Sequence, residues 1–163
     1  MMITGMCAAD VSAAEKKAVT DYQAYAANLD KSAYSGNDLG ASYSKKATTF
    51  KVWSPNAASV RVNIFEHGSD NEGDAGSIMS RAMSLDKTTG VWFVTINGDL
   101  LNKYYTYSVT HGKTTKETAD VYAKACGVNG QRSMVVDLST TNPDGWENDK
   151  HVLVQNQTDA SVW

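Results

Sequence analysis

The sequence predicts an all-β fold, an antiparallel β-sandwich, on two observations: paired strand patterns near its centre, and short strand patterns at regular spacing after them. Residues 48–53 and 59–65 both alternate in polarity, as strands with one buried face do. In the second run Val60, Val62 and Ile64 share the predicted inner face. Pro55 lies between the two runs and has no N–H to donate, so the first strand cannot continue through it as a central strand.

The other expected strands complete this sandwich. They are 39–43, ahead of the central pair, and then 79–85, 91–96, 104–110, 114–118 and 133–138. Glycine-containing turns separate several of them, and a short helix or turn is expected at 120–125. Strands about 8–12 residues apart with turn signals between them are typical of an immunoglobulin-like β-sandwich.

A helical appendage is predicted before the first strand, over residues 12–29. Ser12 and Glu15 have the spacing of a capping box. The apolar stripe of the helix is rich in alanine and tyrosine, and therefore thin, so we expect it to pack on a neighbour rather than to form the core. The predicted organisation is a tail and helix at 1–36, a β-sandwich module at 37–139 and a linker at 140–163.

Composition and charge exclude several classes of function. The 163 residues carry a net charge of −3, which gives no basic footprint for nucleic acid. No apolar run reaches the roughly 20 residues of a membrane span. The N-terminus lacks the pattern of a signal peptide, and the compartment stays open between cytoplasm and secretion. Cys7 and Cys126 are interpreted as unpaired thiols, with a disulfide as the alternative.

An acidic loop is the one place where the sequence resembles a metal site. Asp70, Glu72 and Asp74 alternate as calcium ligands do, but Ala75 and Arg81 occupy the positions of the usual glycine and closing glutamate. A solvated loop is the preferred interpretation, with a calcium loop as the alternative. The three histidines, His67, His111 and His151, have no second ligand at metal spacing, so we expect no metal and no other cofactor.

Four segments together resemble a known family. They are LGASYSKKATTFKVWSPNAASVRVNIF, GVWFVTINGDLLNKYYTYSV, ETADVYAKACGVNGQRSMVVDLSTTNPDGWENDK and NQTDASVW. They resemble, in this order, the N-terminal module of type I pullulanases in the alpha-amylase superfamily, glycoside hydrolase family 13. This module is of the isoamylase N-terminal type, also called carbohydrate-binding module family 48. The resemblance covers roughly residues 37–163 and implies a parent enzyme that hydrolyses α-1,6-glucosidic branch links in pullulan, starch or glycogen.

The resemblance also implies a partner for this chain, the catalytic barrel of the parent enzyme. In those enzymes the segment that matches Asp159–Trp163 begins the first strand of the barrel, so we expect a fragment without that barrel. The chain has no R-x-D nucleophile motif and no Asn-His pair. Retaining glycosidases need two carboxyl groups about 5 Å apart. We therefore expect no enzymatic activity from this chain alone.

The glucan-contacting residues of glycogen-binding members do not carry over. By resemblance, those members have a tryptophan in the loop that matches residues 67–77, a lysine at Thr106, a second tryptophan at Thr114 and an asparagine near Arg132 or Ser133. We therefore expect weak or no α-glucan binding by a module that supports the barrel; an autonomous α-glucan-binding module is the alternative. The candidate carbohydrate-binding residues are Tyr104, Thr106 and Lys113.

The remaining aromatic residues receive structural interpretations. Trp53, Trp92, Tyr105 and Tyr107 are expected in the core or at its edge. Trp146 lies beyond the last strand, and we expect it at the contact with the barrel. The apolar residues of the tail, Val152–Val154 among them, are expected to fold back on the sandwich or to pair between copies.

Overall fold

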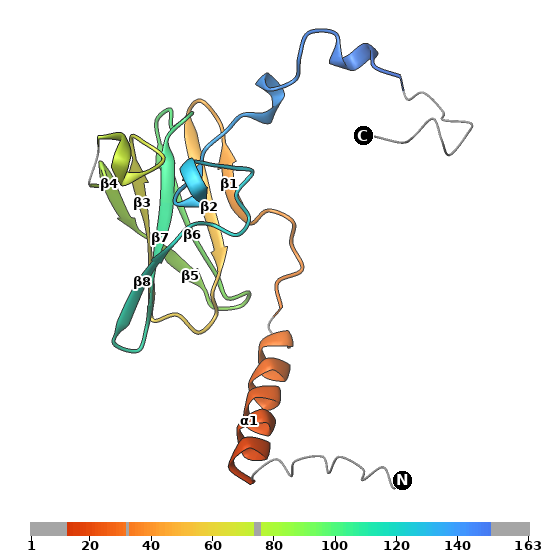
Figure 1. The fold of residues 1–163 in the computed structure, drawn as a ribbon, viewed down its shortest axis with the longest axis vertical. Helices are drawn as coiled ribbons and strands as arrows, with labels where there is room; N and C mark the ends of the chain where they lie inside the picture. The colour runs from red at the N-terminus through yellow and green to blue at the C-terminus, as the bar shows by residue number, and fades with distance from the viewer. Residues whose placement is uncertain (1–12, 32, 74–75, 151–163) are drawn as a thin grey trace, which may run out of the picture.

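Two antiparallel sheets face each other in the computed structural model, which describes residues 13–31, 33–73 and 76–150 (Figure 1). The first sheet has the order β1 (Gly40–Tyr43), β2 (Ala47–Trp53), β6 (Val91–Asn97), β5 (Ser84–Asp86). The second has the order β4 (Met79–Ala82), β3 (Ser59–Phe65), β7 (Tyr104–His111), β10 (Ser133–Met134), β9 (Ala125–Cys126), and β8 (Thr114–Thr118) also pairs with β7. The predicted immunoglobulin-like β-sandwich is confirmed.

The core lies between the sheets and is built as the alternation predicts. Val60, Val62 and Ile64 of β3 are fully buried, and they face Phe50 of β2 across the sandwich. The Phe50 and Tyr105 rings meet edge to face, 4.9 Å between centroids, a favourable arrangement for aromatic pairs. The expectation of a core position for Trp92, Tyr105 and Tyr107 is confirmed.

The prediction of one continuous strand over residues 79–85 is wrong, because this stretch forms two strands. β4 pairs with β3 in one sheet and β5 pairs with β6 in the other. Met83 lies between them with its side chain in the core, and its N–H donates to Val60 O at 2.9 Å. The chain thus changes sheets at Met83, as strands at sandwich corners do.

The expected strand at 133–138 is also too long. β10 ends at Met134, because the next residue leaves the ladder of β7 and turns its side chain into the core: Val135 is buried, and its N–H donates to Lys103 O at 2.9 Å. The Asp137 side chain then accepts from Ser139 N and begins a short 3₁₀ turn, Leu138–Thr140. Three more such turns occur among the described residues, at Asp70–Glu72, Val128–Gly130 and Trp146–Asn148. The expected helix or turn at 120–125 is a turn followed by β9.

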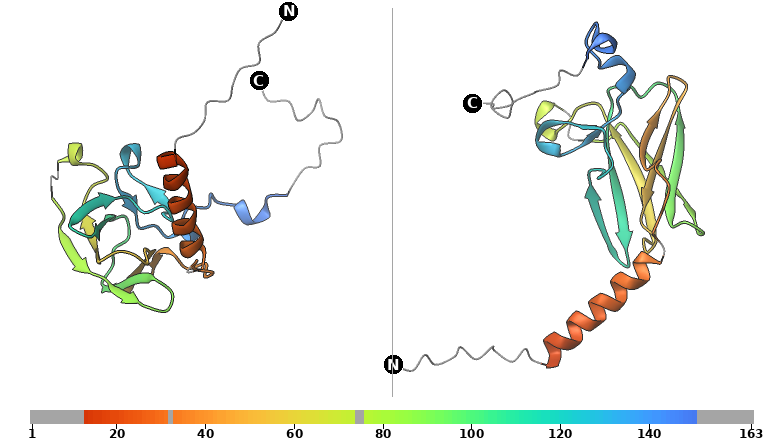
Figure 2. Two further views of the ribbon diagram at one scale, coloured as in Figure 1. Left: turned by 90° about the horizontal axis from the view of Figure 1, so that it is seen from below. Right: turned by 90° about the vertical axis from the view of Figure 1, so that its right-hand side faces the viewer.

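The helix α1 (Ala13–Asp30) projects from one end of the sandwich (Figures 1 and 2). Near its C-terminal end the Tyr25 hydroxyl accepts a hydrogen bond from Asn56 Nδ2 at 3.3 Å, and Tyr22 stays exposed. The helix is therefore an appendage, as expected, and it meets the sandwich through this end. No described helix is long and apolar enough to span a membrane.

The turn between β5 and β6 holds the side chain of Trp53 in place. Its indole N–H donates to Thr89 O at 3.1 Å. Gly90 follows with φ +73°, and a Cβ there would lie 2.7 Å from Cβ of Pro55. Both the left-handed backbone and this close approach favour glycine. The Trp53 ring is thereby fixed beside the turn.

Several expectations concern residues outside the described ranges. These are the Ser12 cap, Cys7, Asp74, His151 and the tail from 151 to 163. Cys126, the described cysteine, is an exposed free thiol on β9.

Candidate functional site

The expected carbohydrate-binding residues do not form one group. Tyr104 and Thr106 lie on the outer face of β7, opposite to the core residues Tyr105 and Tyr107. Lys113 lies in the hairpin turn after His111. His111 is itself about 17 Å from Thr106 along β7, at 3.4 Å per residue. The structure therefore brings Tyr104 and Thr106 to one face and leaves Lys113 apart.

Thr106 is enclosed by its neighbours in the sheet. Its side chain is only 3% exposed. The hydroxyl donates to Glu117 Oε1 on β8 and accepts from Asn63 Nδ2 of β3 at 3.4 Å. Because these partners already satisfy the hydroxyl, Thr106 offers little to a ligand.

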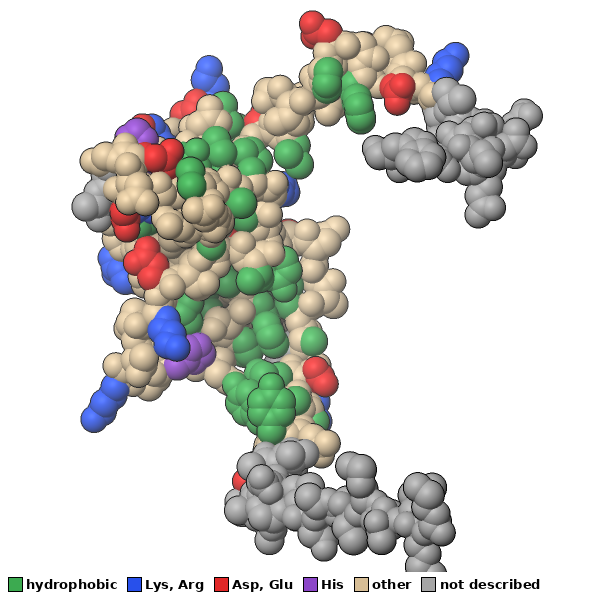
Figure 3. Space-filling model, viewed as in Figure 1, with side chains coloured by type: hydrophobic (Ala, Val, Ile, Leu, Met, Phe, Trp, Pro, Cys, Tyr) green, Lys and Arg blue, Asp and Glu red, His purple; other side chains and the backbone are tan. Residues whose placement is uncertain are grey.

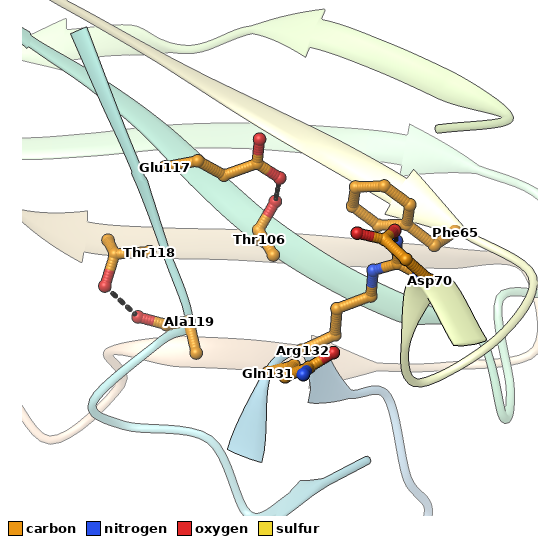
Figure 4. A pocket seen from close by; sticks show the side chains of 8 residues that line it. All are labelled: Phe65, Asp70, Thr106, Glu117, Thr118, Ala119, Gln131 and Arg132. Atoms are coloured by element: carbon orange, nitrogen blue, oxygen red, sulfur yellow. Dashed lines mark hydrogen bonds and ion pairs between the residues drawn. The ribbon is translucent and has the colours of Figure 1, made fainter. Parts of the chain in front are cut away.

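A polar pocket of about 430 Å³ lies beside Thr106 on this outer face (Figure 4). Its lining residues are Phe65, Asp70, Thr106, Glu117, Thr118, Ala119, Gln131 and Arg132. The guanidinium of Arg132 stacks 3.8 Å from the centroid of the Phe65 ring. This cation–π contact covers the aromatic side chain that could otherwise stack on a sugar.

Arg132 is the central residue of this pocket. The family resemblance placed a contact near Arg132 or Ser133 but did not predict a role for the arginine itself. The residue is only 5% exposed. It donates to His67 O at 2.8 Å and forms an ion pair with Asp70. Arg132 thus ties the loop after β3 to the start of β10. The sequence signal for this role was weak, because an arginine beside a strand is usually a solvated residue.

Tyr104 packs beside a close contact between two loops. A Cβ on Gly68 would lie 2.9 Å from Cα of Gly127 and 3.0 Å from the Tyr104 ring. Tyr104 is half-buried there and does not line the polar pocket. Its surroundings indicate a packing role.

The two carboxylates of the polar pocket do not resemble a hydrolytic pair. Asp70 is paired with Arg132, and Glu117 accepts from Thr106. They lie on different sides of the pocket (Figure 4). Within the part of the chain that the structure describes, no group of side chains could hold a metal ion. The outer face therefore offers hydrogen-bonding groups without an open aromatic platform.

Asp120 is a buried carboxylate on the inner side of β7. It accepts from the hydroxyls of Tyr105 at 2.8 Å and Tyr107 at 3.4 Å, and from Tyr122 N at 2.9 Å. Burial raises the pKa of the Asp120 carboxyl, and the three hydrogen bonds oppose that shift in part. Burial and the nearby Asp120 raise the pKa of both tyrosines. This cluster anchors the segment after β8 to β7.

Comparison with known proteins assigns the family. Residues 38–123 match the carbohydrate-binding module 48 family, described as the isoamylase N-terminal domain. The chain belongs to this family. The resemblance to the pullulanase-type module of the family is likewise confirmed by the relatives described next.

The similar proteins are pullulanases. The chain is 34% identical over 117 residues to a pullulanase of Klebsiella pneumoniae, covering 67% of this chain and 10% of the relative. It is 36% identical over 110 residues to a pullulanase of Bacillus subtilis (strain 168), covering 68% and 14%. The chain therefore spans about a seventh or less of the length of these relatives.

Solved structures agree with these matches. The pullulanase from Bacillus acidopullulyticus is 40% identical with a TM-score of 0.65, covering 72% of this chain and 14% of that one. The pullulanase from Paenibacillus barengoltzii, solved in complex with maltohexaose and alpha-cyclodextrin, is 38% identical with a TM-score of 0.69, covering 78% and 19%.

Proposed function

We propose that this chain is the accessory β-sandwich module of a pullulanase-like debranching enzyme and that it supports the catalytic barrel without catalysing a reaction itself. The parent enzyme would hydrolyse α-1,6-glucosidic branch links in pullulan, starch or glycogen. Membership of the module family and similarity to pullulanases support this proposal.

The observation that carries the supporting role is a series of exposed apolar side chains after β8. Its members are Val121, Tyr122, Val128, Leu138 and Trp146. Val121 is 85% exposed and Trp146 is 57% exposed. Figure 3 shows hydrophobic side chains open to solvent over this region of the fold. Exposed apolar side chains that recur along one stretch of a chain are candidates for an interaction surface, and here they favour a contact with the catalytic barrel.

A chimeric enzyme tests this role. The matching region of the Bacillus subtilis pullulanase would be replaced by residues 37–150 of this chain, and the chimera compared with an enzyme that lacks the module. We expect the chimera to keep a higher unfolding temperature and more pullulan hydrolysis. The double variant Val121→Asp with Leu138→Asp should remove this gain. The control variant Ile78→Asp should not, because Ile78 is another exposed apolar residue but lies beside β4, on the side of β3 away from β7. An enzyme equally stable and active without any module would overturn the proposal.

Weak α-glucan binding is the second candidate function. The family description favours it, as does the complex of the Paenibacillus barengoltzii relative with maltohexaose and alpha-cyclodextrin. In the outer pocket Arg132 covers the Phe65 ring and is itself paired with Asp70, which argues for low affinity on that face.

A further inference from the structure

We propose that the turn at residues 120–123 is the principal contact point for the catalytic barrel, and that Asp120 is the residue that positions it. This inference rests on the proposed barrel contact. The turn presents two neighbouring apolar side chains to solvent: Val121 is 85% exposed and Tyr122 is 47% exposed. The backbone of the turn is attached to both sheets of the sandwich, and this attachment carries the argument.

Asp120 attaches the start of the turn to the second sheet. Its carboxylate accepts hydrogen bonds from the hydroxyls of Tyr105 and Tyr107 on β7, at 2.8 and 3.4 Å. Its backbone N–H donates to Ser133 Oγ on β10 at 2.8 Å. Tyr105, Tyr107 and Ser133 are all buried. The attachment therefore lies inside the module, where a hydrogen bond is stronger than in water.

The same carboxylate also fixes the backbone of the turn. Its Oδ1 atom accepts from Tyr122 N at 2.9 Å, while Oδ2 is the atom that faces the two tyrosine hydroxyls. The turn is closed by Ala123 N, which donates to Asp120 O at 3.2 Å. One buried side chain thus holds both the core of the module and the residue that carries the exposed tyrosine.

The other side of the turn meets the first sheet at β1. Gly40 has φ +93°, and a Cβ there would lie 2.9 Å from Tyr122 O and 3.3 Å from Tyr122 Cβ. Tyr122 therefore packs directly on the backbone of β1, an approach that a larger residue at position 40 would prevent. The turn spans the edge of the sandwich and is in contact with each sheet.

Other members of the exposed apolar series lie on turns with local closing bonds. Leu138 O accepts from Thr141 N at 3.3 Å, and Trp146 O accepts from Asp149 N at 3.1 Å. A group that is fixed before association loses less conformational freedom when the partner binds. Tyrosine is also one of the residue types that dominate binding energy at interfaces. The turn with Val121 and Tyr122 is therefore the best prepared contact of the series.

Amide hydrogen exchange of the whole chain, followed by ¹⁵N NMR, tests whether Asp120 positions the turn. Exchange at Tyr122 is compared with exchange at Val62 of β3, which reports the folding of the sandwich. In Asp120→Ala we expect Tyr122 exchange to rise at least about tenfold relative to Val62. Asp120→Asn should restore most of the protection, because asparagine keeps an oxygen that accepts from Tyr122 N. An unchanged ratio in Asp120→Ala would overturn the positioning role.

A second variant serves if Asp120→Ala does not fold. Gly40→Ala leaves the Asp120 hydrogen bonds in place but pushes its new Cβ against the Tyr122 backbone. We expect this variant also to raise Tyr122 exchange relative to Val62. An unchanged ratio would show that the contact with β1 does not hold the turn, and would overturn its attachment to both sheets.

The chimeric pullulanase tests the contact itself. The measured quantity is the half-life of pullulan hydrolysis at a temperature at which the module stays folded, divided by the half-life of the enzyme without the module. Val121→Gln adds no charge beside Asp120 and should lower this ratio about fivefold. Val128→Gln is the matched change at a 51% exposed valine of the same series, and it should lower the ratio less than about twofold.

A double variant separates positioning from general stability. If Asp120 acts through the turn, Asp120→Ala combined with Val121→Gln should lower the ratio no further than Val121→Gln alone, because the contact is already lost. Gly90→Ala weakens the fold at another turn and should leave the ratio within about twofold. Effects of Asp120→Ala and Val121→Gln that multiply would overturn the positioning role.

The inference and the proposed function fail in different ways. Equal losses for Val121→Gln and Val128→Gln would overturn the turn as the principal contact and keep the barrel contact. An enzyme equally stable with and without the module would overturn the barrel contact and with it this inference.

Discussion

Replacing Asp120 with alanine should destabilise the sandwich strongly, because the carboxylate is the acceptor of two buried tyrosine hydroxyls. The Tyr105 bond is 2.8 Å and the Tyr107 bond 3.4 Å. Hydrogen bonds to charged groups contribute about 1.5–3 kcal/mol each, and an unsatisfied buried group costs about 1–3 kcal/mol. The alanine variant no longer has to bury a charged group, and this offsets part of the loss. The net decrease in the free energy of unfolding is about 3 kcal/mol, roughly a hundredfold in the folding equilibrium.

Urea unfolding followed by circular dichroism measures this loss, and Asp120→Asn is the matched control. Asparagine keeps one acceptor oxygen, so we expect it to cost about 1 kcal/mol. An alanine variant within about 0.5 kcal/mol of the unaltered protein, the usual range for surface substitutions, would refute the assignment of Asp120 as an anchor.

The unaltered protein and the Asp120→Asn variant should also differ in how their free energy of unfolding depends on pH. Burial raises the pKa of Asp120 above its ordinary value of 3.8. The carboxyl therefore contributes most to stability below that value, where it is protonated in both the folded and the unfolded state, and the contribution is lost as the pH rises through the folded-state pKa. The stability advantage of Asp120 over asparagine should decrease across this window. An advantage that grows with pH would contradict the argument.

Three further outcomes are expected. Arg132→Ala should uncover Phe65, lower the free energy of unfolding by about 2 kcal/mol and speed amide exchange in residues 67–73; unchanged exchange would deny Arg132 its role in holding that loop. Gly90→Ala should cost about 1–3 kcal/mol in thermal unfolding, since its φ is +73° and Pro55 is 2.7 Å from the new Cβ; a higher melting temperature would contradict this. The purified chain should release no reducing sugar from pullulan above a buffer blank, and release would disprove its non-catalytic role.

Local patterns predicted much of this fold, because alternation and turn residues report what each strand buries. The expected bounds of 59–65 and 114–118 coincide with β3 and β8. The prediction failed at 79–85, where the residues look strand-like throughout and the change of sheet at Met83 depends on which strands lie beside it. No local pattern contains that information.

The candidate site was less predictable because its contacts are distant in sequence. Arg132 stacks on Phe65 and pairs with Asp70 across more than sixty residues. Thr106 appears in the sequence as an outward-facing strand residue, yet Asn63 and Glu117 from both neighbouring strands enclose it. Position on a strand predicts a face, and the neighbours decide whether that face is open.

The register of the β7–β8 hairpin determines which face of the sheet Thr106 and Thr114 occupy. His111 pairs with Thr114 across a turn of two residues, with Gly112 at φ +59°. This register places Thr114 on the inner face of the hairpin, the face of Tyr107 and Val109, whereas Thr106 lies on the outer face. A shift of one residue would exchange the two faces of β8. The two positions at which glycogen-binding members, by resemblance, carry a lysine and a second tryptophan, Thr106 and Thr114, therefore lie on opposite faces of this hairpin, so a single flat ligand surface on β7 and β8 cannot include both.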